Sequence, residues 1–232
     1  MLDQAIEHYK EALKIRRELV QIDESFKPKL ANTLNKLANA YFGKGLLDEA
    51  IEHYEEALKI RRELAEKDKC LKPKLADSLS NLANAFRSKG LLDEAISHYE
   101  EALVIRRELV RLDDCFKPKL ANVLNSLANV YFGKGLLDQA IENYKEAVKI
   151  RRQLIETEAT YRLQFTTSLI LLGIAFATRE TGEDRVLFKQ LQTEAKAMLR
   201  DPAITGSRQY SELVNLAKIL DSLVGKSQNS ST

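Results

Sequence analysis

Histidine and cysteine, the residue types best suited to metal or redox chemistry, recur in this chain at one fixed interval. His8, His53 and His98 lie 45 residues apart, and so do Cys70 and Cys115. Equivalent sites in stacked repeats lie roughly 9–10 Å apart for each helix packed between them, whereas a metal holds its ligands at about 2 Å. The spacing therefore predicts neither a metal site nor a disulfide, and reduced thiols of a cytoplasmic protein are expected.

Arginine pairs form the second chemical pattern, at 16–17, 61–62, 106–107 and 151–152. They are compatible with a basic stripe for an acidic partner or with solvated side chains at helix C-termini, and we favour the second interpretation. The chain shows no Gly-rich phosphate loop, nucleophile elbow or paired catalytic carboxylate. We therefore expect a protein that is not an enzyme and has no cofactor.

Composition narrows the class of protein further. The chain of 232 residues has 36 basic and 34 acidic side chains, and 44% of its residues are hydrophobic. No block is strongly basic, so nucleic acid is not an expected partner. Neither a charged-then-apolar leader nor a run of about 20 apolar residues is present, so the sequence predicts neither secretion nor membrane spanning.

The whole sequence, and not only its polar residues, repeats every 45 residues. Segments 46–90 and 91–135 agree at 30 of 45 positions without a gap. Two helices are predicted in each repeat, for example 30–42 and a second helix that opens at Asp48 and runs past Arg62. Pro28 suits the first turn of the first helix, and Gly43 and Gly45 are predicted to form its left-handed stop. A period of this kind is typical of a solenoid.

The apolar and small residues of each repeat resemble the signature of the tetratricopeptide repeat, in the subtype found in kinesin light chains. With Ala31 as position 1, the matching residues of the second repeat are Leu37, Ala38, Tyr41, Gly45, Ala50, Tyr54, Ala57 and Leu58. The closing proline of the family is replaced by arginine, so the second helix should be longer than in the 34-residue form. The resemblance implies an all-α fold, an α-solenoid in which helical hairpins form a right-handed superhelix.

The predicted domain organisation follows the strength of the repeat. Residues 1–160 form the repeat array, which starts at a second helix, and 161–225 form a degenerate repeat with capping helices. Within that second segment, helices are expected over 162–177, 184–200 and 207–224, and 226–232 is expected to be a disordered tail.

In this family, the first helices line a concave groove through positions 2, 5, 9 and 12. Position 9 is asparagine each time, so the resemblance implies a row of amides that bind an extended peptide; amides that brace neighbouring helices are the alternative. The implied groove residues are Asn32, Asn35, Asn39, Phe42, Asp77, Ser80, Asn84, Arg87, Asn122, Asn125, Asn129 and Phe132.

Three functional hypotheses remain open. The first is a scaffold or adaptor that binds a protein or peptide partner in the groove. The second is a regulatory or sensor segment of a larger signalling NTPase. The third is self-association through the uncapped N-terminal helix, whose first partner helix is missing from the pattern.

Overall fold

The computed structural model describes residues 2–179 and 181–229, and helices dominate them. The chain divides into two compact units, 1–113 and 114–232, which are described separately. This division falls between two hairpins of the predicted array. The predicted boundary at 160/161 stays a prediction.

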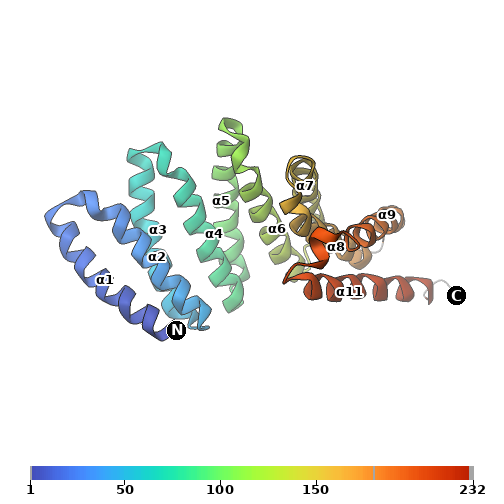
Figure 1. Ribbon diagram of the computed structural model, residues 1–232, viewed down its shortest axis with the longest axis horizontal. Coiled ribbons are helices and arrows are strands. Elements are labelled where there is room, and N and C mark those ends of the chain that lie inside the picture. The colour runs from blue at the N-terminus through green and yellow to red at the C-terminus, as the bar shows by residue number, and fades with distance from the viewer. Residues whose placement is uncertain (1, 180, 230–232) are drawn as a thin grey trace. The chain divides into compact units, whose positions relative to one another are not determined.

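The first unit consists of one leading helix followed by two helical hairpins (Figure 1). Helix α1 packs on the first helix of hairpin α2–α3, and α3 packs on the first helix of hairpin α4–α5. A short 3₁₀ turn joins each second helix to the next first helix. The elements are α1 (Leu2–Ile22), η1 (Glu24–Phe26), α2 (Lys27–Gly43), α3 (Leu47–Lys67), η2 (Lys69–Leu71), α4 (Lys72–Lys89) and α5 (Leu92–Leu112).

The second unit contains two hairpins and a final helix (Figure 1). Hairpin α6–α7 is followed by α8–α9, α7 packs on α8, and α11 lies against α8. The elements are η3 (Asp114–Phe116), α6 (Lys117–Gly133), α7 (Leu137–Thr157), η4 (Ala159–Tyr161), α8 (Arg162–Arg179), α9 (Gly182–Met198), α10 (Pro202–Thr205) and α11 (Tyr210–Asn229).

Local sequence signals set the helix boundaries. Asp68 Oδ1 accepts a hydrogen bond of 2.9 Å from the Cys70 amide and so starts the 3₁₀ turn, and a proline lies in the first turn of α2, α4 and α6. Gly45, Gly90 and Gly135 have φ between 76° and 85°, a conformation that favours glycine, and they end the first helices. The prediction was wrong for Gly43, which is the last helical residue of α2 and not part of a left-handed stop.

The hairpins are held together by small and aromatic side chains, as the pattern predicts. Ala50 and Ala57 are fully buried, and Tyr54 is 2% exposed between them. The second helix α3 has 21 residues, which confirms that the arginine at the place of the closing proline allows a longer helix.

The C-terminal helices differ in detail from the prediction. The segment predicted as a break, 201–206, contains the short helix α10, and α11 continues to Asn229, four residues into the predicted disordered tail. The last three residues of that tail lie outside the described part of the chain. Helix α11 packs on α8 so closely that a Cβ at Gly173 would be 2.8 Å from Leu220 Cδ1. This glycine therefore provides the space for α11.

Candidate binding surface

The asparagines at position 9 are fixed by tyrosines of the second helices. The hydroxyl groups of Tyr54, Tyr99 and Tyr144 donate to the Oδ1 atoms of the asparagines 15 residues earlier, over 2.5, 2.6 and 2.5 Å. Burial raises the pKa of Tyr54 to about 12, so its hydroxyl stays protonated as the donor.

This bond leaves the other end of each amide available. Asn39 is exposed, and Asn84 and Asn129 are half-buried. Within the described residues, the Nδ2 atoms of these three asparagines make no hydrogen bond to the protein. The amides thus brace the hairpins through their oxygens and present N–H donors on the first-helix face.

Position 2 is occupied by an acceptor for a buried arginine. Arg61 Nη2 donates to Asn32 Oδ1 over 3.0 Å, and Arg61 Nη1 donates to the Lys74 carbonyl over 3.1 Å and to the Ser78 hydroxyl. Arg61 is only 7% exposed, and burial lowers its pKa. One guanidinium therefore connects the two helices of its own hairpin to the first helix of the next.

The bond to position 2 recurs in α5 and α7, and the bond to the next first helix recurs in α7. Arg106 Nη2 donates to Asp77 Oδ1 over 2.6 Å, and Arg151 Nη2 donates to Asn122 Oδ1 over 2.8 Å. Arg151 Nη1 also donates to the Gln164 carbonyl over 2.8 Å. Burial lowers the pKa of Arg151 to about 10. The expectation that these arginines are solvated was wrong, because all three are buried. For Arg61 and Arg151, the next first helix covers the helix end on which they lie.

In three of the four arginine pairs, the second arginine forms an exposed ion pair between second helices. Arg17 contacts Glu56 at 2.7 Å, Arg62 contacts Glu101 at 2.5 Å and Arg152 contacts Glu194 at 2.8 Å. These side chains are already paired within the chain. They therefore do not form the unpaired basic stripe that an acidic partner would need.

Position 5 is engaged in bonds inside the fold. Asn125 is 9% exposed and its Oδ1 accepts from the Ser168 hydroxyl over 2.9 Å, whereas Asn35 Oδ1 accepts from Asn81 Nδ2 over 3.5 Å. Ser80 donates to the Ala76 carbonyl over 2.8 Å in its own helix. Asn35 and Asn125 therefore belong to the packing between first helices, whereas Ser80 is bonded within α4.

Position 12 contributes the larger side chains of the surface. Phe42 and Phe132 are half-buried, and Phe132 packs against the core of the second unit. Arg87, at the same position of α4, is exposed. In the first unit the surface thus combines amide donors with Phe42 and Arg87, and in the second unit Phe132 accompanies the amide of Asn129.

The first-helix face changes character in α8. Its residues at positions 5 and 9 are Ile170, which is fully buried, and Ile174, which is half-buried, and both belong to the cluster that includes Leu213 and Leu220 of α11. The chain's own last helix therefore covers the part of α8 that corresponds to the amide surface of the preceding first helices.

The histidines have a structural role in the hairpins. His53 stacks on Tyr41 with ring centroids 5.5 Å apart, and His98 stacks on Phe86 at 5.4 Å. Burial lowers the pKa of both histidines. The described residues contain no group of three metal-ligating side chains, and Cys70 and Cys115 are exposed and not joined in a disulfide.

Helical hairpins of this length and pattern define the class of protein. The tetratricopeptide-repeat family model matches residues 1–63, 29–108 and 74–153, and the chain belongs to this family. Such repeats generally serve as protein-interaction scaffolds and are typically non-enzymatic. In the described part of the chain, no helix is long and apolar enough to cross a bilayer.

Solved structures share the fold at low sequence identity. BtubC (BKLC) from P. vanneervenii is 20% identical with a TM-score of 0.65, and the match covers 99% of this chain and 90% of that protein. A Podosopora anserina protein described as a kinesin light chain, with nearly identical TPR-like repeats, is 21% identical with a TM-score of 0.60; the match covers 86% of this chain and 94% of that one. These likenesses show the same α-solenoid fold, and the family match confirms the predicted tetratricopeptide repeats. Among curated proteins, no sequence matches this chain.

Proposed function

We propose that this protein is an interaction scaffold that binds an extended peptide of a protein partner on its first-helix surface. The supporting observation is the orientation of the position-9 amides. Each tyrosine hydroxyl fixes one amide oxygen, so each Nδ2 is held in place as a donor for a peptide carbonyl. Preorganised donors lose little conformational freedom when a ligand binds.

The proposed contacts are of modest strength. A hydrogen bond from one amide contributes about 0.5–1.5 kcal/mol net, so Asn39 and Asn84 of the first unit would supply only part of the affinity. Phe42 and Arg87 are proposed to select the side chains of the peptide, because aromatic residues and arginine are frequent in binding hot spots. Positions 2 and 5 are proposed to support the surface and not to contact the peptide, since their side chains are engaged within the fold.

The test uses a displayed library of random peptides selected on the full chain. Selected peptides should bind Asn39→Ala/Asn84→Ala at least about tenfold more weakly, the factor expected for two lost bonds. Glu55→Ala/Lys59→Ala, which alters exposed residues of α3, is the matched control and should bind as the parent does. Peptides that lose binding only with the α3 variant would refute the proposed surface.

A cytoplasmic, non-enzymatic role without nucleic acid or membrane as partner remains our proposal. The regulatory segment of a signalling NTPase finds no support in the family match or in the similar structures.

A further inference from the structure

A cleft of about 430 Å³ in the second unit is lined by residues of α7, α8 and α9. Its apolar floor consists of three buried side chains, those of Leu172 and Phe176 of α8 and Val148 of α7. Small-molecule sites have volumes of this order and are common between the helices of helical proteins. None of the residues proposed to bind a peptide lines the cleft, so it is a separate surface of the protein.

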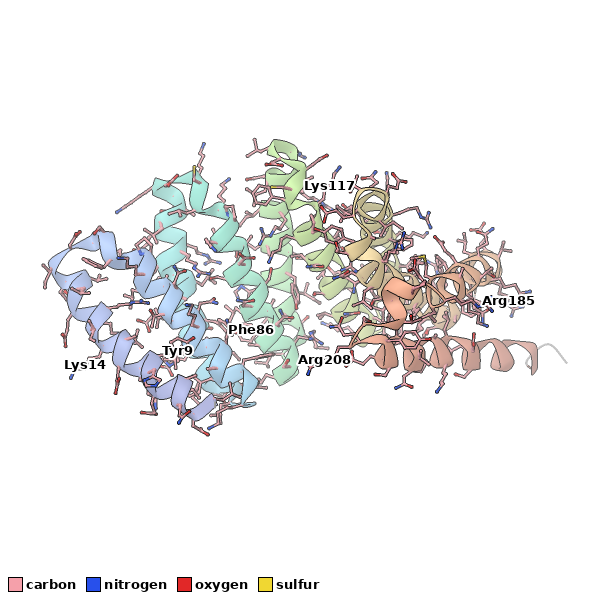
Figure 2. The ribbon with its side chains drawn as sticks, in the orientation of Figure 1. Tyr9, Lys14, Phe86, Lys117, Arg185 and Arg208 are labelled. Atoms are coloured by element: carbon pink, nitrogen blue, oxygen red, sulfur yellow. The ribbon has the colours of Figure 1, made fainter. Side chains whose placement is uncertain are left out.

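The two walls of the cleft differ in their chemistry. On α7, three cationic side chains stand at positions i, i+4 and i+7; they are Lys145, Lys149 and Arg152. On α9, two leucines and one carboxylate have the same spacing; they are Leu187, Leu191 and Glu194. Residues at this spacing lie on one side of a helix. Arg185, a little over half a turn from Leu187, lies on the side of α9 that faces away from α7 (Figure 2).

An ion pair crosses the cleft from one wall to the other. Arg152 Nη2 donates to both carboxylate oxygens of Glu194, over 2.9 and 2.8 Å. Both α7 and α9 are joined to α8 by short connections, so the two helices run in the same direction. The equal spacing on the two helices therefore places the two lysines and the two leucines together, on the N-terminal side of this ion pair.

The two lysines are available to a ligand. Both are exposed, and within the described residues neither forms an ion pair. The ammonium group of Lys145 lies 5.2 Å from the ring centroid of Phe176, so a cation borders directly on the apolar floor. Leu187, on the opposite wall, is 39% exposed. An apolar surface beside these positive charges is complementary to an amphipathic anion.

The equivalent cleft in the first unit has the opposite balance of charge. It is lined by residues of α3, α4 and α5, two repeats earlier, and has a volume of about 380 Å³. Its charged lining residues are three carboxylates and two cations, namely Glu55, Glu63, Glu66, Lys59 and Arg62. The α7–α9 cleft has three cations and two carboxylates, and one of these carboxylates is bound to Arg152.

Sequence differences on both walls account for this contrast. In α7, Lys145 stands where α3 has Glu55. In α9, Leu191 stands where α5 has Glu101, the ion-pair partner of Arg62. The α7–α9 cleft thus has a cation and an apolar side chain at positions where α3 and α5 have carboxylates.

We propose that the α7–α9 cleft binds a small amphipathic carboxylate, whose apolar body covers Leu172 and Phe176 and whose anionic group binds Lys145 and Lys149. Lysine suits this task because its ammonium is a compact charge on a flexible stem, which can adjust to a single carboxylate. A cationic ligand of the same shape would be repelled by the two lysines. The proposal does not depend on the peptide surface of the first helices.

The test adds decanoate, below its micellar concentration, to the isotope-labelled full chain and follows the amide signals by NMR. Signals of residues 145–153 and 187–194, which border the cleft, should shift until the site is saturated. Decyltrimethylammonium has an alkyl chain of similar length and the opposite charge, and it should bind at least about fivefold more weakly. Equal binding of the two amphiphiles, or no saturable shifts in these two segments, would overturn the proposal.

Matched variants locate the charge that binds the carboxylate. Lys145→Gln/Lys149→Gln should weaken decanoate binding about fivefold, or about 1 kcal/mol, the contribution of two exposed charge pairs. Glu55→Gln/Lys59→Gln changes the same two positions of α3 and should leave binding unchanged. Lys145→Glu/Lys149→Glu should reverse the preference, so that the cation binds more tightly than decanoate. A charge-reversed variant that still prefers decanoate would refute the proposal.

A protein partner is the rival occupant of the cleft. The peptides selected on the full chain distinguish it from a small molecule. If decanoate causes no shifts in the cleft, while the selected peptides bind Lys145→Gln/Lys149→Gln more weakly than the parent chain, the cleft serves a protein partner and the proposal is overturned. Selected peptides that bind both chains equally, together with saturable decanoate shifts, support the small-molecule site.

Discussion

Replacement of Arg61 by methionine tests whether buried guanidinium groups hold neighbouring hairpins together. Methionine keeps much of the apolar volume of the stem but removes the donors to Asn32, Lys74 and Ser78. The Ser78 hydroxyl is fully buried, and a buried polar group without a partner costs about 1–3 kcal/mol. Asn32 and Lys74 are exposed and can bind water, so each loses only about 0.5–1.5 kcal/mol net.

The removal of a buried charge offsets part of this loss, because the desolvation of the guanidinium no longer opposes folding. We therefore expect Arg61→Met to lower the free energy of unfolding by about 2–3 kcal/mol. Arg62→Met is the matched control in the adjacent position. It breaks the exposed pair with Glu101 and should cost about 0.2–1 kcal/mol.

Urea unfolding of the full chain by circular dichroism measures the difference. Repeat arrays depart from two-state unfolding, so amide hydrogen exchange in α2, α3 and α4 should accompany it and locate the loss. If Arg61→Met destabilises the protein no more than Arg62→Met, the guanidinium does not connect the hairpins as described.

Two further predictions concern the histidines and the C-terminal packing. Because burial holds the pKa of His53 and His98 below that of the unfolded chain, about 6.5, the unfolded state binds more protons as the pH falls through this value. The free energy of unfolding should therefore decrease below about pH 6.5. Replacement of both histidines by asparagine should flatten this pH dependence in urea titrations. An unchanged pH profile would contradict the assignment of the effect to these two histidines. Gly173→Ala should destabilise the packing of α11 on α8, because the new Cβ meets Leu220, and faster amide exchange confined to these helices would show it.

The fold was predictable because each local pattern agrees with its neighbours. The interval of 45 residues, the first-turn prolines and the apolar spacing all indicate the same pair of helices, and the structure confirms them. The predicted helix boundaries near the C-terminus were less accurate, because the degenerate repeat at 161–225 has few residues that match those of the preceding repeats. Ile170 and Ile174 stand where the preceding first helices have polar residues, but nothing in the pattern showed that α11 would cover them.

The candidate surface was predictable in position but not in chemistry. The resemblance placed the position-9 asparagines on the first helices, whereas their bonds to tyrosine depend on contacts within the hairpin. The buried arginines were missed because a cation at a helix C-terminus normally has a sufficient explanation in the helix dipole. A signal was present: Arg61, Arg106 and Arg151 each follow an asparagine or aspartate by 29 residues.

The guanidinium of Arg61, which joins three helices, limits how a gene for such a chain can lengthen or shorten. Its acceptors lie 29 residues before it and 13 and 17 residues after it, in two different repeats. Recombination that adds or deletes whole 45-residue segments restores every acceptor, whatever the point of crossover. A deletion of another length between Asn32 and Ser78 would shift the buried guanidinium away from its acceptors, so the repeat period is constrained more tightly than the number of repeats.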